Sequence, residues 1–182
     1  MDLSNQQPLP VTQQQAWAAL NDVELLKQSI PGCESFTAAG ENTFELLVAA
    51  AVGPVKARFK SKLQLLDVVA PQSYTMQFDG QGGPAGFGKG TAKVNLVAAD
   101  DGTTVLHYAV NAQVGGKIAQ IGSRLVDMAA QKMAQDFFAN FTRVVVEKYP
   151  PPAAPAAAPV PPAPKGLLAR LLAFLRRLFG GR

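Results

Sequence analysis

The sequence predicts an α+β domain in which a curved antiparallel β-meander closes round one long C-terminal helix. Residues 44–114 alternate apolar and polar side chains, whereas residues 117–148 repeat apolar side chains at helical spacing. The length of 182 residues is enough for one such domain and an appendage. A sheet with one apolar face and a helix with one apolar stripe bury each other, and this gives the fold class.

Two short helices are predicted ahead of the sheet. Thr12 and Gln15 have the spacing of a capping box, directly before the stretch "AWAAL". A second helix is expected after Asn21 or Asp22, through "VELLKQS", and it should end at the Pro31-Gly32 pair.

The clearest predicted strand is "VKARFKSKLQL", residues 55–65. Lysine, arginine and glutamine alternate there with apolar side chains, which are Val55, Ala57, Phe59, Leu63 and Leu65. The same period of two runs through residues 44–52, 74–78, 91–97 and 103–114. Strands with one apolar and one polar face are typical of an antiparallel sheet joined by hairpins.

The long helix is predicted from about Lys117 to Lys148, which corresponds to roughly 48 Å. Its apolar stripe begins at Ile118 and continues through Ile121, Leu125, Met128, Met133, Phe137, Phe141 and Val144. This stripe is the face that should cover the sheet.

Alternate turns of a meander lie at the same end of the sheet. Residues 39–42, 70–72 and 100–102 read as short polar hairpins. The other end gathers the glycine-rich turns, including the long segment 80–90. Either these glycines allow a strongly bent sheet, or they form a gate that opens for a ligand, and the two readings are compatible. The candidate gate residues are Pro31, Gly32, Gly82, Gly83, Gly86, Gly88, Gly115 and Gly116.

The sequence offers little catalytic chemistry. It contains one histidine, His107, and one cysteine, Cys33, so no metal site is predicted. The carboxylates are scattered, and no catalytic residue is predicted. The interior is expected to be apolar, either as a solid core or as the wall of a cavity. The candidate cavity residues are Ile30, Phe59, Leu63, Phe78, Phe87, Leu96, Tyr108, Ile121, Leu125 and Met128.

The C-terminal residues divide the chain into three parts. Residues 1–148 form the predicted domain, residues 149–164 a proline- and alanine-rich linker, and residues 165–182 a basic amphipathic tail. The linker should be an extended spacer of roughly 46 Å. Wound as a helix, the tail would lie on an anionic membrane surface, although docking into the groove of a partner protein is the alternative. The predicted membrane-binding residues are Leu167, Leu168, Arg170, Leu171, Leu172, Phe174, Leu175, Arg176, Arg177, Leu178 and Phe179.

The net charge of +4 originates in this tail, which holds five of the 17 basic residues and no acidic one. The remaining chain is close to neutral, so a nucleic-acid-binding surface is not expected. The N-terminus lacks a secretion signal and the single cysteine forms no internal disulfide, which together predict a bacterial cytosolic protein. With the tail, we expect a peripheral location at the cytoplasmic face of the plasma membrane.

Four stretches of the chain resemble the CoxG family, the G subunits of carbon monoxide dehydrogenase. They are "NDVELLKQSIPGCESF", "VGPVKARFKSKLQL", "GQGGPAGFGKG" and "AQVGGKIAQIGSRLVDMAAQKMAQDFF". The resemblance implies the helix-grip fold of the START-like (SRPBCC) superfamily. It further implies a role beside a molybdenum-containing CO dehydrogenase or related hydroxylase, with an isoprenoid quinone (ubiquinone or menaquinone) as ligand.

Three functions follow as expectations. The first is a membrane-tethered carrier that brings respiratory quinone to the dehydrogenase. The second is an adaptor with a solid core, which only recruits or assembles the enzyme at the membrane. The third is an enzyme, because some helix-grip proteins are cyclases or dehydratases, but Tyr108 alone gives this reading thin support.

Overall fold

The computed structural model describes residues 1–150, so the predicted tail and nearly all of the predicted linker lie outside the described residues. The described elements follow in the order β1 (Asp2–Leu9), α1 (Gln13–Leu20), α2 (Val23–Ser29), β2 (Cys33–Gly40), β3 (Thr43–Val52), β4 (Val55–Val69), β5 (Ser73–Gln81), a 3-10 turn (Gly83–Ala85), β6 (Phe87–Ala98), β7 (Thr104–Gly115), α3 (Lys117–Gln120) and α4 (Ser123–Lys148).

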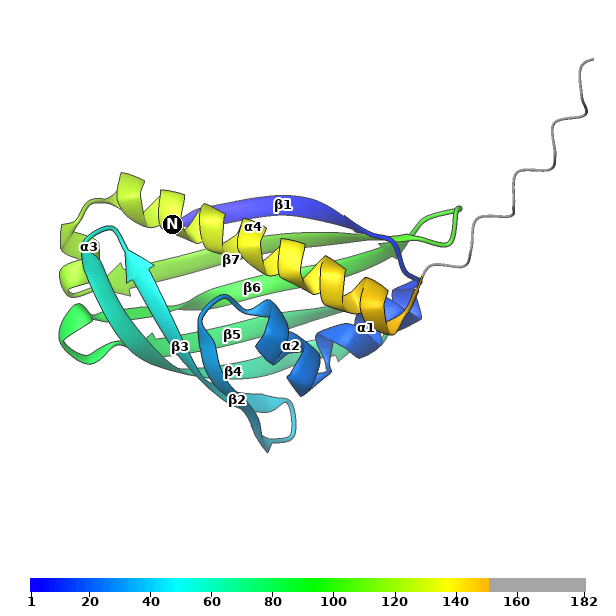
Figure 1. The fold of residues 1–182 in the computed structure, drawn as a ribbon, viewed down its shortest axis with the longest axis horizontal. Coiled ribbons are helices and arrows are strands. Elements are labelled where there is room, and N and C mark those ends of the chain that lie inside the picture. Colours follow the sequence, from blue (N-terminus) through cyan, green and yellow to red (C-terminus); the bar gives the residue numbers. More distant parts are fainter. Residues whose placement is uncertain (151–182) are drawn as a thin grey trace, which may run out of the picture. The chain divides into compact units, whose positions relative to one another are not determined.

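The predicted α+β architecture is confirmed. All seven strands form one antiparallel sheet in the order β1-β7-β6-β5-β4-β3-β2, and α4 runs across one face of it (Figure 1). We call the face toward α4 the inner face. Consecutive strands from β2 to β7 are neighbours, as a meander requires.

Strand β1 was not predicted from the sequence. It pairs with β7 from Asp2↔Asn111 to Leu9↔Thr104 and forms one edge of the sheet. Its residues, "DLSNQQPL", are mostly polar, so they carry no apolar alternation. Backbone pairing with β7 stabilises this strand, together with the burial of Leu9 at its end.

Both short helices begin as the sequence indicates. The Gln15 N–H donates to the Thr12 hydroxyl at 3.3 Å, and the Thr12 N–H donates to the Gln15 side-chain oxygen at 3.0 Å, which completes the capping box. The Asp22 carboxylate caps α2 by accepting hydrogen bonds from the N–H groups of Glu24 (3.0 Å) and Leu25 (3.1 Å). These caps satisfy backbone donors that a helix leaves free in its first turn.

The predicted single helix of residues 117–148 is wrong at its start. One turn, α3, is separated from the 26-residue α4 by Gly122, whose φ of 97° lies outside the helical region. The apolar stripe runs across this break, because Ile118 and Ile121 keep the spacing of the helix that follows. Side-chain periodicity therefore could not reveal the interruption.

The predicted long loop of residues 80–90 is much shorter in the structure. Strand β5 extends to Gln81 and β6 begins at Phe87, so only the 3-10 turn and its flanking glycines connect them. The register of β5 against β6 runs without a shift through Gly88 and Gly90. Backbone pairing tolerates these glycines, although they give no alternation in the sequence.

Within residues 1–150, no helix has the length and apolar character needed to cross a bilayer.

Candidate ligand site between the sheet and the long helix

The inner side of the sheet is packed solid at the end covered by the C-terminal half of α4. Phe141 and Val145 have no exposed surface there, and they belong to one buried cluster with Leu9, Leu96 and Leu106. Burial raises the pKa of the Tyr74 hydroxyl well above its usual range in this cluster. This end is a core and has no room for a ligand.

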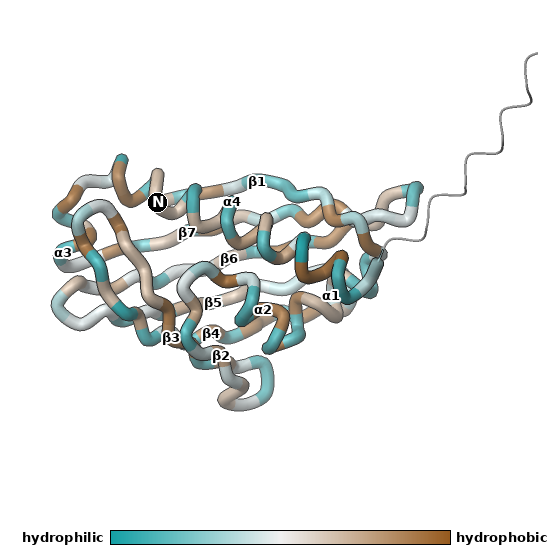
Figure 2. Tube along the Cα trace, in the orientation of Figure 1, coloured by the Kyte–Doolittle hydropathy of each residue, from teal (hydrophilic) through white to brown (hydrophobic). Residues whose placement is uncertain are grey.

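The other end of the inner face is apolar but incompletely covered. Phe59 and Leu63 on β4 and Phe78 on β5 are only partly buried, and Leu63 pairs directly with Phe78 across the strands. On α4, the residue buried at this end is Val126, 7% exposed, whereas Leu125 (44%) and Met128 (57%) lie on its more exposed side. Figure 2 shows the apolar stretch of β3 that runs along this end toward α3. Leu63 also packs on the small cluster of Phe36, Leu46 and Val48, so Phe59 and Phe78 are the apolar side chains of the sheet that remain incompletely covered here.

The two walls meet at the turn between β3 and β4. A Cβ atom on Gly53 would lie 3.6 Å from Ile121 Cδ1 and 3.8 Å from Leu125 Cδ1, which is ordinary van der Waals contact. The turn thus closes the grip against the start of α4, and α4 also packs on α2. Of the predicted cavity residues, Phe59, Leu63 and Phe78 lie on the inner face of the sheet at this end, and Ile121 and Leu125 adjoin the β3–β4 turn. Met128 lies on the exposed side of α4 and is not brought to them.

One polar residue on the same wall was not predicted. Ser61 lies between Phe59 and Leu63 on the inner face of β4, opposite Gly80 of β5. Its hydroxyl has no hydrogen-bond partner among residues 1–150, and it would be 2.7 Å from a Cβ on Gly80. The strand alternation places Ser61 inside, and this signal was available from the sequence. An inward hydroxyl can donate a hydrogen bond to a carbonyl oxygen of a bound molecule.

Four predicted cavity residues lie elsewhere or are already packed. Leu96 is 2% exposed within the solid core, and the Tyr108 ring lies 5.0 Å from the Phe138 ring. Ile30 packs on the small cluster of Phe36, Leu46 and Val48. Phe87 shares a face of β6 with the exposed Lys89, whose ammonium lies 5.8 Å from its ring, so Phe87 is on the outer face.

The candidate gate residues lie in the turns at the open end, and several of them bring two backbones together. The Ala49 N–H donates to the Gly32 carbonyl at 2.8 Å. Cβ atoms on Gly82 and Gly86 would overlap the Phe59 ring and the Gly115 carbonyl, respectively. Three further candidates also have close neighbours: Gly88 is near a Val114 methyl, Gly115 adjoins the Phe87 ring and Gly116 adjoins Gly86. Pro31 is partly buried, and Gly83 has open space around it. The glycines therefore allow close packing in this conformation.

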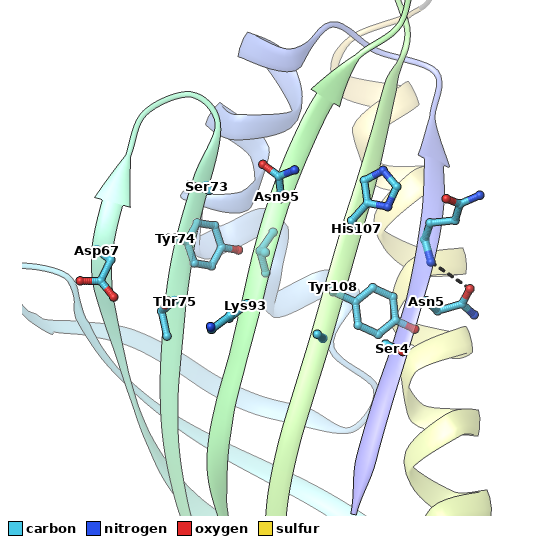
Figure 3. Close-up of a pocket in the computed structure, with 13 residues that line it drawn as sticks. Ser4, Asn5, Asp67, Ser73, Tyr74, Thr75, Lys93, Asn95, His107 and Tyr108 are labelled. Atoms are coloured by element: carbon cyan, nitrogen blue, oxygen red, sulfur yellow. Dashed lines mark hydrogen bonds between the residues drawn. The ribbon is translucent and has the colours of Figure 1, made fainter.

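A shallow polar groove of about 900 Å³ lies on the opposite, outer face of the sheet (Figure 3). Ser73, Asn95 and His107 line it from β5, β6 and β7, and Asp67 lies at its β4 side. Three strand spacings separate Asp67 from His107, about 14 Å, so the two cannot share a proton. This groove offers hydrogen bonds but no acid–base pair.

Ionisable and metal-binding groups do not gather at the inner site. Among residues 1–150, no three His, Cys, Asp or Glu side chains stand close enough to hold a metal ion. The Cys33 thiol donates to the Ser35 carbonyl at 3.3 Å, and partial burial raises its pKa. A raised thiol pKa keeps the group protonated and poorly nucleophilic.

The fold and sequence are similar to known proteins. A conserved protein from Geobacillus kaustophilus is 28% identical with a TM-score of 0.77, covering 81% of this chain and 97% of that one. A START superfamily protein from Mycobacterium smegmatis is 12% identical with a TM-score of 0.63, covering 81% and 98%. The Zhui aromatase/cyclase from Streptomyces sp. R1128 is 10% identical with a TM-score of 0.59, covering 81% and 94%, which shows a shared fold alone. No curated protein sequence matches the chain.

The sequence pattern of one family matches most of the described domain. It covers residues 7–146 and includes the apolar wall of β4 and β5, the glycine-rich turns and nearly all of α4. Together with the helix-grip architecture, this places the chain in the CoxG family, the G subunits of carbon monoxide dehydrogenase.

Proposed function

We propose that this protein is a carrier of a hydrophobic ligand, an isoprenoid quinone such as ubiquinone or menaquinone, and that it serves a molybdenum-containing CO dehydrogenase or a related hydroxylase. The observation that carries this proposal is the incompletely covered apolar wall between the sheet and the first half of α4. Phe59, Leu63 and Phe78 of the sheet are only partly buried beneath this half of the helix, which buries Val126. An isoprenoid chain would supply the contacts that these side chains lack.

The chemistry of the wall suits a quinone better than a charged lipid. Its inward positions are apolar apart from the Ser61 hydroxyl, so a buried charge would have no partner. A quinone carries two carbonyl oxygens on an otherwise apolar molecule. One hydroxyl donor at the wall matches this pattern and would hold the ring while the prenyl chain lies along the apolar surface.

The partner and the location are supported by the family and the tail. The family is named for its association with carbon monoxide dehydrogenase, and an accessory role needs no catalytic group of its own. The tail of residues 165–182 carries basic and apolar residues without an acid. We propose that it tethers the domain to the anionic inner leaflet, so that the carrier moves between the membrane and the enzyme.

Organic extraction of the purified full-length protein, followed by mass spectrometry, tests the carrier directly. A quinone should be recovered in a fixed ratio to protein, both from the native chain and from Leu171→Glu with Leu175→Glu in the tail. The tail variant is the matched control, because it separates a quinone held in the domain from one dissolved in lipid on the tail. A ligand-free protein that still supports CO respiration would contradict the carrier and favour the adaptor.

The same double substitution tests the tether. Two glutamates on the apolar face of the tail should release the protein from anionic liposomes in a sedimentation assay, because burying a carboxylate in the interface is costly. The circular dichroism spectrum of the domain should be unchanged. If the variant still sediments with liposomes to the same extent, the tail is not the tether.

A further inference from the structure

One end of the domain combines exposed apolar side chains with unpaired cations. We define this mouth face as the β3–β4 turn, the 3-10 turn of Gly83–Ala85, α3 and the first two turns of α4, which lie together at the left of Figure 1. We propose that the mouth face docks on an anionic lipid surface by itself, in addition to the tail. The purpose of this docking rests on the proposed carrier function, but the docking does not depend on it.

The apolar part of the mouth face comes from α4. Leu125 and Met128 are 44% and 57% exposed and lie one turn apart on the helix, so they form a continuous ridge. Gly53 of the β3–β4 turn lies against Leu125, and the exposed Pro54 follows it. Such a cluster is costly in water and is of the size that inserts below lipid headgroups.

The charged part lies at the same end of the domain, on both faces of the sheet. Lys117 on α3 and Arg124 on α4 precede the ridge in sequence, and Lys56 and Lys89 begin the neighbouring strands. All four side chains are exposed, and none forms an ion pair within residues 1–150. Asp2, Asp79 and Asp127 lie toward the same end without an ion pair, and Glu34 pairs there with Arg58, so the unpaired cations outnumber the unpaired carboxylates by one.

The opposite end of the sheet has the reverse charge. Its turns carry the exposed carboxylates of Glu41, Asp67, Asp100 and Asp101, and no lysine or arginine lies between residues 39–42, 67–72 or 99–103. The domain is therefore polarised along its strands. A negatively charged membrane would attract the mouth face and repel the far turns, which orients the domain before contact.

This orientation would place the open end of the apolar wall against the bilayer. A prenylated molecule could then move from lipid to the space beside Phe59 and Phe78 without crossing water. An acidic protein surface is the competing occupant, since it would also attract the cations. It would not, however, offer a fluid apolar layer for Leu125 and Met128 to enter.

A single environment-sensitive dye tests the proposal. The native Cys33 is replaced by serine, and a nitrobenzoxadiazole dye is attached in the full chain through Met128→Cys. The matched control is Val97→Cys, because Val97 is 45% exposed but lies near the far end of β6. The vesicles contain no quinone and consist of equal parts phosphatidylglycerol and phosphatidylcholine, or of phosphatidylcholine alone.

The dye at Met128→Cys should shift to the blue on anionic vesicles, also when Leu171→Glu and Leu175→Glu disable the tail. The dye at Val97→Cys should not shift. Reversing two charges, Lys117→Glu with Arg124→Glu, should weaken binding of the tail-disabled chain at least 25-fold, since each cation contributes roughly fivefold on an anionic surface and the new carboxylates are repelled by it.

Three results would overturn the proposal: no shift at Met128→Cys on anionic vesicles, an equal shift at Val97→Cys, or a shift that is indifferent to the charge reversal. A shift caused only by the purified dehydrogenase would also overturn it and assign the mouth face to the enzyme. Each of these outcomes leaves the quinone extraction result unaffected, so the carrier and the docking face stand or fall separately.

Discussion

Adding the same side chain at two alanines tests whether the inner face is hollow at one end and solid at the other. Ala57 on β4 and Ala92 on β6 both point to the inner face, but Ala57 is partly exposed near the open end and Ala92 is 4% exposed in the middle of the sheet. The changes Ala57→Leu and Ala92→Leu add identical volume. Only the space available around each residue differs.

The structure gives different magnitudes for the two variants. Ala92→Leu forces extra carbon atoms into a filled core and should cost about 1–3 kcal/mol in the free energy of unfolding. For a domain of this size, that lowers Tm by about 2–12 °C. Ala57→Leu should change stability by no more than about 0.5 kcal/mol, because Ala57 is only partly buried and the larger side chain can extend outward without displacing packed atoms.

The assay is thermal and urea unfolding of both variants in the ligand-free state, followed by quinone extraction. Ala57→Leu should hold less quinone than the native chain while keeping its stability, whereas Ala92→Leu should lose stability. Equal destabilisation by the two substitutions would refute the reasoning, since it would mean that the open end is packed as tightly as the core.

Three further predictions concern single residues. Ser61→Ala should weaken quinone binding by roughly 2- to 13-fold, the effect of one hydrogen bond, in a fluorescence titration, and unchanged affinity would remove Ser61 from the site. Gly86→Ala should lower Tm far more than the control Gly83→Ala. Both glycines have a positive φ, but only a Cβ on Gly86 would overlap a backbone atom, the carbonyl oxygen of Gly115. Similar Tm values would contradict this. The hydrogen bond from Lys148 lowers the pKa of the Asp22 carboxyl, so its stabilising effect is present above the unfolded pKa of about 3.9 and is lost as the pH falls below it. Asp22→Asn should therefore show a shallower loss of stability below about pH 4 in acid titration, and a slope equal to the native one would exclude this ion pair.

The sequence could predict those features that depend on local period and on turn chemistry. Alternation in residues 55–65 placed Phe59 and Leu63 on one face, and the capping box located the start of α1. Strand β1 escaped prediction because an edge strand is held by backbone pairing and needs no apolar pattern. The break at Gly122 escaped because the stripe of α4 continues through it.

The composition of the tail and the apolar face of the alternating strands β3 to β7 were determined by the sequence alone. The spacing of apolar residues assigns a side chain to one face of a strand or helix, but it does not say how closely the neighbouring helix or sheet approaches that face. Leu96 and Leu125 were both predicted to point inward, yet Leu96 is 2% exposed and Leu125 is 44% exposed, because α4 buries the neighbouring Val126 (7% exposed) instead of Leu125. Only the tertiary structure decided this difference. How well a side chain is covered depends on how the helix packs on the sheet, and the residues that come into contact there are far apart in the sequence.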